Sequence, residues 1–240
     1  MWSETELAEL QSVVADAAKD VELVRLRTQL GKFTAETFGN LGEELLAIGH
    51  IFGPDRKNGV SPGGHGSDEI VAVSVLLRIA AQLVSASTDL FADGRQYAAA
   101  ALLRQLVEVE YLAWAFQTRD EDAERWLRST REERESFFRP AKLRQASKGK
   151  FRSKDYGYHC ELGGHPVPGA YVLLRKDVSS GQLLMSDMLG HTGRLWDHIR
   201  DWATENEWVA TLVLRFADEM SRRYAEWKCT DSLTQLPPPP

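Results

Sequence analysis

Cysteine is scarce in this chain, and the two that occur cannot form a disulfide framework. Cys160 and Cys229 lie far apart and outside any paired motif. At 240 residues the chain is long enough to bury a large hydrophobic core without disulfides or structural metals. The composition therefore indicates a reducing compartment, and we expect a cytoplasmic protein.

Long uninterrupted apolar runs are also missing. The first ten residues, MWSETELAEL, have neither the positive nor the apolar region of a secretory signal. Charged residues interrupt the two most apolar stretches, 70–86 and 97–116; these residues are Arg78 in the first and Arg104, Glu108 and Glu110 in the second. We therefore expect no membrane association.

Several patterns of metal-binding and catalytic proteins are absent as well. No Glu-x-x-His occurs, although a carboxylate-bridged di-iron bundle would carry one on two helices. The glycine-rich stretch 53–67 lacks the Lys-Ser/Thr of a phosphate-binding loop. His159, Cys160 and His165 lack a fourth ligand at suitable spacing, and no Ser or Cys nucleophile with a base is indicated. The sequence predicts neither a metal site nor a cofactor.

Helical periodicity dominates what is present. Apolar residues recur three or four apart from Leu7 to Val24, and the stripe restarts from Leu26 to Ile48. We expect this helix to continue with a rotated face or to bend near residues 24–31. Ser67, followed by two acidic residues, begins another helix that ends near residue 92.

Helical signals continue through the rest of the chain. Asp93 and Gly94 precede a helix at 97–117 that is apolar on nearly every side, as expected of a central helix. A shorter charged helix carrying Trp126 follows, and Pro140 predicts a break after it. The heptad-like stripes at 184–202 and 209–227, joined by a few residues, predict an antiparallel helical hairpin.

No alternating strand longer than AYVLL and no internal repeat is found. The predicted fold class is all-α: a single-domain helical bundle of about six or seven helices over residues 1–232. Two long Gly/Pro loops, 53–67 and 163–178, interrupt it, and residues 233–240 form a disordered Pro-rich tail.

Charge is distributed unevenly along the chain. The formal net charge is −6, yet residues 125–154 contain eleven Lys or Arg against three Glu. Such segregation predicts a segment that faces an anion, and we expect RNA as its partner. The alternative is a solvated helix and loop, because REERE carries opposite charges at helical spacing.

Arg152 and His159 have six residues between them, so on a helix both side chains would lie within about 20° of one face. An imidazole that moves the proton of a ribose hydroxyl and a guanidinium that holds the phosphate suit metal-free RNA cleavage. This spacing in a helical protein resembles the HEPN superfamily of ribonucleases and toxins. The resemblance implies a metal-independent endoribonuclease or a toxin or defence effector, with two copies of the polar cleft facing each other in a homodimer.

A second constellation lies on the apolar helix. Arg104 and Glu108 are one turn apart, and Tyr111 lies on the same face. The two charged residues form either an internal ion pair or, with His165 from the following loop, the lining of a polar pocket. LLRQLVEVEYLAWAF and YHCELGGHP together resemble uncharacterised bacterial helical proteins related to abortive-infection proteins. That resemblance marks Arg104, Glu108, Tyr158, His165 and Pro166.

The hypothesis assigns catalysis and substrate binding to two sets of residues. The catalytic candidates are His165, His159, Arg152, Arg104 and Glu108, and the substrate-binding candidates are Tyr111, Tyr158, Lys148, Lys150 and Lys154. Two other functions stay open. They are a non-enzymatic helical protein-interaction module and a sensor of a small molecule in a bundle pocket.

Overall fold

The computed structural model describes residues 4–51, 67–119, 121–175, 178–205 and 207–236. In this part of the chain the regular structure is entirely helical, with ten α-helices, short 3-10 and π segments and no strand. The expected all-α class is confirmed. AYVLL, the closest approach to a strand pattern, lies in the 3-10 segment η3 (Pro168–Leu174).

The N-terminal stripe is divided between two helices, α1 (Glu4–Lys19) and α2 (Val21–Ile51). The break lies at Asp20 rather than at the expected residues 24–31. Asp20 Oδ1 accepts hydrogen bonds from the backbone N–H groups of Glu22 at 2.9 Å and Leu23 at 3.1 Å. A side chain that satisfies these free donors begins a new helix there.

The boundaries of the next two helices follow the local sequence signals. In α3 (Asp68–Ala92) the Ser67 side chain accepts from the backbone of Ile70, and two acidic residues occupy the first turn. Gly94 has a φ of +73°, the left-handed conformation that glycine tolerates, between α3 and α4 (Gln96–Thr118). Both predicted helices are confirmed.

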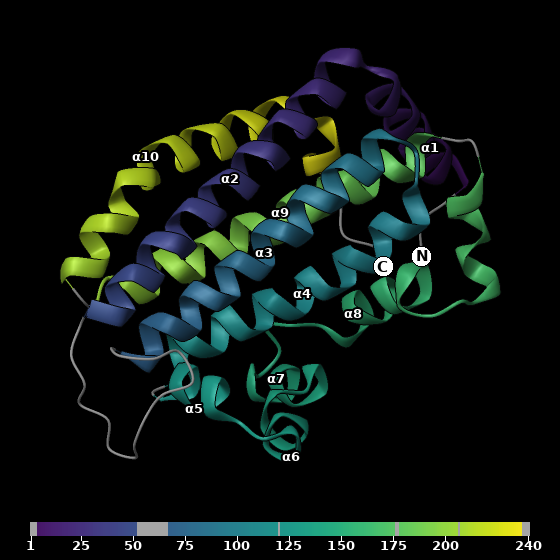
Figure 1. Cartoon of the computed structure of the whole chain (residues 1–240). Coiled ribbons are helices and arrows are strands. Elements are labelled where there is room, and N and C mark those ends of the chain that lie inside the picture. The colour runs from purple at the N-terminus through teal and green to yellow at the C-terminus, as the bar shows by residue number, and fades with distance from the viewer. Residues whose placement is uncertain (1–3, 52–66, 120, 176–177, 206, 237–240) are drawn as a thin grey trace.

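Helix α4 lies in the centre of the molecule. It packs against α3 on one side and against α9 (Val178–Ala203) on another, as Figure 1 shows, and α3 in turn packs against α2. Its buried residues cover most of the helix, among them Leu103 and Phe116, while Gln105 is exposed and Arg104 and Glu108 are partly exposed. Helix α4 is therefore a core helix, as predicted, but one polar face of it is not surrounded.

The segment after α4 contains more helices than expected. It folds into α5 (Asp122–Arg128), α6 (Arg131–Glu133), α7 (Pro140–Ala146) and α8 (Ser153–His159), with π segments η1 (Arg134–Phe138) and η2 (Cys160–Gly164). Pro140 stands at the start of α7, because its ring suits the first helical position. These short helices, with the break at Asp20, raise the number above the six or seven that periodicity predicted.

The last two long helices, α9 and α10 (Glu207–Thr230), pack against each other, and α10 also packs against α2. The 3-10 segment η4 (Ser232–Gln235) follows α10, so part of the expected Pro-rich tail is ordered against the body. Of the two expected long loops, residues 53–66 lie outside the described part of the chain. The other loop includes η3.

Helix α3 is long and apolar enough to cross a membrane by length and composition alone. However, 56% of its most apolar window is buried inside the protein. Its place between α2 and α4 accounts for this composition, since the core helix of a globular domain has the same character.

Candidate metal centre

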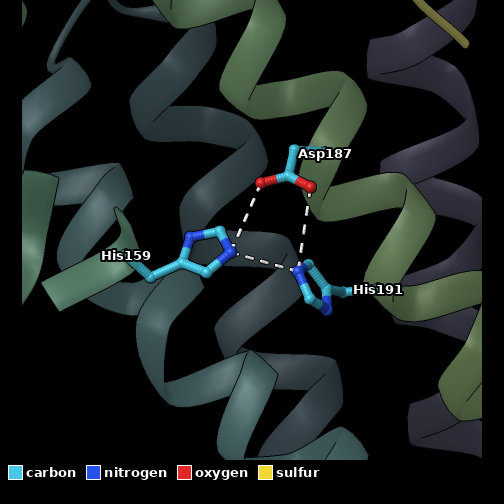
Figure 2. A group of neighbouring side chains, drawn as sticks. All are labelled: His159, Asp187 and His191. Carbon is cyan, nitrogen blue, oxygen red and sulfur yellow. Dashed lines mark hydrogen bonds and ion pairs between the residues drawn. The ribbon is translucent and has the colours of Figure 1, made fainter. Parts of the chain in front are cut away.

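Two helices, α8 and α9, bring three ionisable side chains together beside α4. His159 is the last residue of α8, and Asp187 and His191 lie one turn apart on α9, so both face the same way. Figure 2 shows the carboxylate and the two imidazoles pointing toward one another. The side chains of His159 and His191 are 4% and 8% exposed, whereas that of Asp187 is 37% exposed.

The potential ligand atoms of these residues form a compact triangle. His159 Nε2 and His191 Nε2 are 3.2 Å apart. Asp187 Oδ2 is 3.5 Å from His159 Nε2, and Asp187 Oδ1 is 3.7 Å from His191 Nε2. Ligands bound about 2.0–2.1 Å from a tetrahedral metal ion are about 3.3 Å apart, so the triangle has the size that such an ion requires.

Glu110 contacts the ring nitrogen of His191 that does not take part in the triangle. This residue of α4 is 1% exposed, and its Oε2 lies 2.5 Å from His191 Nδ1. Burial alone would raise the pKa of Glu110, but the charges and hydrogen bonds of His191 and Arg194 lower it to about 2. An ionised carboxylate only accepts, so His191 Nδ1 carries the proton of this hydrogen bond. Arg194 Nη2 also lies 2.8 Å from His191 Nδ1. A metal ion that replaces any proton on Nε2 would meet the lone pair of this nitrogen on the side of the triangle.

Arg194 compensates the charge of Glu110. Its Nε donates to Glu110 Oε1 at 2.8 Å and its Nη2 to Oε2 at 3.3 Å. A buried carboxylate needs such partners, because removing it from water without them costs on the order of several kcal/mol. Glu110 therefore stays charged and accepts from His191.

His159 is neutral at physiological pH. Burial lowers the pKa of His159 to about 4, although the negative charge of Asp187 acts in the opposite direction. A neutral imidazole offers a lone pair to a metal ion without first losing a proton. Two imidazoles and one carboxylate are a ligand set that divalent transition metals accept.

The Glu110 contact has a direct parallel in metal sites. A metal-binding histidine usually donates its other ring N–H to a carboxylate, which fixes the tautomer and raises its basicity. His191 has this arrangement with Glu110. Within the described ranges no other group of three His, Cys, Asp or Glu residues has this spacing.

A separate polar network lies on α4 on the N-terminal side of Glu110. Arg104 Nη2 pairs with Glu108 Oε1 at 2.9 Å and donates to the Tyr156 hydroxyl at 2.9 Å, and that hydroxyl donates to Glu108 at 2.8 Å. Burial, together with the Glu108 bond, raises the pKa of Tyr156 to about 12, so the hydroxyl keeps its proton. Tyr111 does not join this network. It is buried against Phe151, with ring centroids 4.1 Å apart.

The two residues of the expected nuclease spacing are separated. Arg152 precedes α8 in an extended conformation, and its exposed side chain pairs with Asp155 at 3.1 Å. His159 is buried at the other end of the same helix. They do not share a helical face as expected, because only residues inside a helix follow its periodicity.

The GGHP element reaches α4, but its histidine does not reach the centre. Gly163 packs directly on the backbone of Ala100 and Ala101, and Gly164 packs against the side chain of Arg104. His165 follows in an extended conformation and is exposed. The remaining candidates lie on the surface: Tyr158 is 46% exposed, its ring stands edge-on to that of His159, and Lys148, Lys150 and Lys154 are exposed.

Sequence reasoning missed Asp187, His191, Glu110 and Arg194. His191 falls within the apolar stripe predicted at 184–202, and Glu110 interrupts the apolar stretch 97–116. The available signal was Asp-x-x-x-His at 187–191, a spacing that places two ligands on one helical face. This spacing differs from the Glu-x-x-His of a di-iron bundle, which the sequence lacks.

No protein-family model matches the chain, and no curated protein or solved structure matches it either.

Proposed function

We propose that this protein is a metal-dependent hydrolase in which His159, Asp187 and His191 bind one divalent transition-metal ion. The convergence of the three ligand atoms at separations of 3.2, 3.5 and 3.7 Å carries this proposal. The Glu110 contact supports it, since it presents the His191 lone pair toward the other two ligands.

The chemistry follows from the number of ligands. Three protein ligands leave a coordination position for water, as in catalytic rather than structural sites. A metal ion lowers the pKa of such a water to about 7, so that hydroxide is available near neutral pH. Asp187 is the most exposed ligand, so substrate approaches from its side while the imidazoles remain shielded.

Metal binding is measured on protein stripped with a chelator and then titrated with Co²⁺. We expect one ion per chain, with the visible absorption bands of a tetrahedral or five-coordinate site, and displacement by Zn²⁺. His159→Ala, Asp187→Ala and His191→Ala should each weaken binding strongly. His165→Ala is the matched control, because that histidine is exposed and outside the triangle.

Catalysis is tested separately from binding. The metal-loaded protein should hydrolyse a chromogenic ester, and Asp187→Ala should abolish this activity while the chain stays folded by circular dichroism. Equal metal binding by the wild type and all three ligand variants would refute the site. Tight metal binding without hydrolysis would support the metal site and refute the proposed hydrolase activity.

A second candidate is metal-independent RNA cleavage of the HEPN type. The contact between the two imidazoles favours it, because His159 Nε2 and His191 Nε2 at 3.2 Å allow a proton to pass between a base and an acid. Ribonuclease activity that persists in EDTA and is lost in His159→Ala would select this function. Activity restored only by added metal would select the hydrolase.

Dimerisation and RNA binding belong to this second candidate. A protein that acts as a homodimer should sediment at twice the monomer mass, and RNA should bind through the basic segment 125–154. The interaction module and the small-molecule sensor require none of the cluster histidines. A phenotype unaffected by His159→Ala and His191→Ala would favour these two.

A further inference from the structure

A depression of about 610 Å³ opens on the surface between α7 and the start of α8. Its lining includes Arg144, Gln145, Gly149, Phe151, Arg152 and Ser153. We call it the basic depression. It lies inside the basic segment 125–154, and none of its lining residues is acidic.

Arg144 has donors that no group in the described part of the chain satisfies. Its guanidinium stacks over the ring of Tyr156, with Cζ 4.2 Å from the ring centroid. Its Nε and Nη1 are buried and have no hydrogen-bond partner among the described residues. The guanidinium charge therefore lacks an acceptor at these two atoms, and an anion in the depression, which Arg144 helps to line, would compensate it.

Arg152 lies on the same depression. Its Nε pairs with Asp155, and Lys148, Lys150 and Lys154 are exposed nearby in the sequence. From Arg144 to Asp155 the chain carries five basic residues and one acidic residue. This local excess of positive charge favours a ligand with more than one negative charge.

The local backbone holds these groups in place. The chain reverses through Lys148, with a φ of +51°, and Gly149, with a φ of +97°. Ser147 Oγ accepts from the backbone N–H of Phe151 at 3.2 Å. The Phe151 ring is anchored against Tyr111 and against Trp114, whose ring centroid is 5.4 Å away. Arg144 on α7 and Arg152 beyond the turn are therefore held on either side of an anchored turn.

We propose that the basic depression binds a phosphate group of the substrate, held by the guanidinium groups of Arg144 and Arg152. Guanidinium forks match the oxygens of phosphate, and phosphate carries the multiple charge that the site favours. In naming the substrate class this inference rests on the proposed function. Phosphate binding itself requires no metal.

The depression and the metal centre lie at opposite ends of α8. Arg152 immediately precedes this helix and His159 ends it, so their Cα atoms are seven residue steps apart, which is about 10 Å along the helix axis. The bound phosphate is therefore a handle on the substrate and not the group attacked by metal-bound hydroxide. We therefore expect a substrate in which the phosphate lies about 10 Å from the bond that is hydrolysed.

Binding is tested with inorganic phosphate on chelator-treated protein, by isothermal titration at constant ionic strength, with chloride as the reference anion. A nucleoside monophosphate and a short oligoribonucleotide form two further arms, which separate a small phosphorylated molecule from a phosphate of a nucleic acid chain. The variants are Arg152→Gln and Arg144→Gln. The matched control is Arg139→Gln, since Arg139 is equally exposed in the basic segment and pairs with Glu135 at 3.3 Å, yet lies outside the depression.

We expect saturable phosphate binding by the wild type. Arg152→Gln should weaken it at least about tenfold, because one charge-assisted contact is lost, and Arg139→Gln should leave it unchanged. Arg152 is exposed, so its variant should fold even if Arg144→Gln does not. Absence of saturable binding, or equal loss in Arg139→Gln, overturns the proposal. Because the metal is absent, either result leaves the Co²⁺ titration to decide the metal centre independently.

Discussion

Glu110 is a carboxylate almost without solvent contact, and its two partners determine what it can do. Arg194 neutralises its charge, and His191 donates to it. The same side chain therefore stabilises the packing of α4 on α9 and orients a metal ligand. A substitution at this position should affect stability and metal affinity together.

For Glu110→Gln we expect metal affinity to fall about 10–100-fold, the usual effect of losing a carboxylate behind a metal-bound histidine. The amide oxygen still accepts from His191, but without the charge that raises the basicity of the imidazole. The Co²⁺ titration described above measures this. Glu108→Gln on the same helix is the control, because Glu108 pairs with Arg104 outside the centre. Equal effects of the two substitutions would contradict the assigned role.

His198 provides a prediction of pH dependence away from the metal ligands. Burial and the nearby charge of Lys150 lower the pKa of His198 to about 4, against the opposing charges of Glu110 and Asp201. In the unfolded chain the pKa is about 6.5, so the unfolded state binds the proton first as pH falls. The stabilising contribution is therefore complete above about pH 6.5 and is lost as pH falls toward 4.

Between about pH 7 and 4.5 we expect the free energy of unfolding of the wild type to fall more than that of His198→Asn. The difference should be about 1–2 kcal/mol after allowance for solvent screening. Asparagine keeps a donor for Gln117 Oε1, which lies 2.5 Å from His198 Nδ1. Urea denaturation across this pH range gives the comparison, with His165→Ala as an exposed control. Parallel pH profiles of His198→Asn and wild type would show that His198 is not responsible.

At the scale of elements, the position of η2 against α4 decides where His159 lies. Helix α8 ends at His159, and the chain continues directly as the π segment η2. A Cβ at Gly163 would lie 2.4 Å from the carbonyl carbon of Ala100 and 2.5 Å from the nitrogen of Ala101. Backbone atoms in the middle of a packed helix cannot move aside, so only glycine permits this approach.

Gly163→Ala should therefore push η2 away from α4, with a cost of about 1–3 kcal/mol in the free energy of unfolding and a loss of metal affinity. Gly157→Ala is the matched control in α8, because a Cβ there meets nothing within 4 Å. In a helix interior this second change should stabilise by about 0.5–1 kcal/mol. Urea denaturation distinguishes the two. Destabilisation by both would show that close packing on α4 is not the cause.

At the scale of the whole molecule, a buried ion pair joins α2 to the residue that follows α10. Arg27 of α2 donates to both carboxylate oxygens of Asp231 at 2.6 and 2.7 Å, and both side chains are fully buried. Arg27 also donates to Gln182 on α9 and to the carbonyl of Ala17 on α1. One guanidinium thus connects α1, α2, α9 and the C-terminal end of α10.

Asp231→Ala should destabilise the protein by about 3–5 kcal/mol, because it leaves the Arg27 charge buried without its partner. Glu22→Ala, which removes the exposed partner of Arg25, should cost no more than about 1 kcal/mol. Chemical denaturation at neutral pH measures both. A small effect of Asp231→Ala would mean that water or Gln182 replaces the carboxylate.

The sequence predicted the long helices well, since their signals act over one or two turns. The Ser67 cap, the turn at Gly94 and the proline at 140 stand at observed boundaries. Of the short helices it predicted only α5, which carries Trp126, because apolar spacing over seven residues or fewer is too brief to separate α6, α7 and α8. Asp20 was missed because its capping bonds interrupt a stripe that otherwise looks continuous.

The candidate site was predicted only in part. His159 was selected for a spacing to Arg152 that the structure does not use, whereas its partners lie on other helices. His191 is 81 residues from Glu110 and 32 from His159. Contacts over such separations depend on how each helix is rotated about its axis and which face it packs, and local periodicity does not encode them.

The sequence by itself thus determined an all-helical chain with a central apolar helix and a strongly basic segment, because these properties are set by composition and by neighbours within a few residues. Only the tertiary structure decided that Glu110, His159, Asp187 and His191 meet. The packing of α8 and η2 against α4 and of α9 along α4 brings these charged groups together, where each supplies a partner that burial requires of the others.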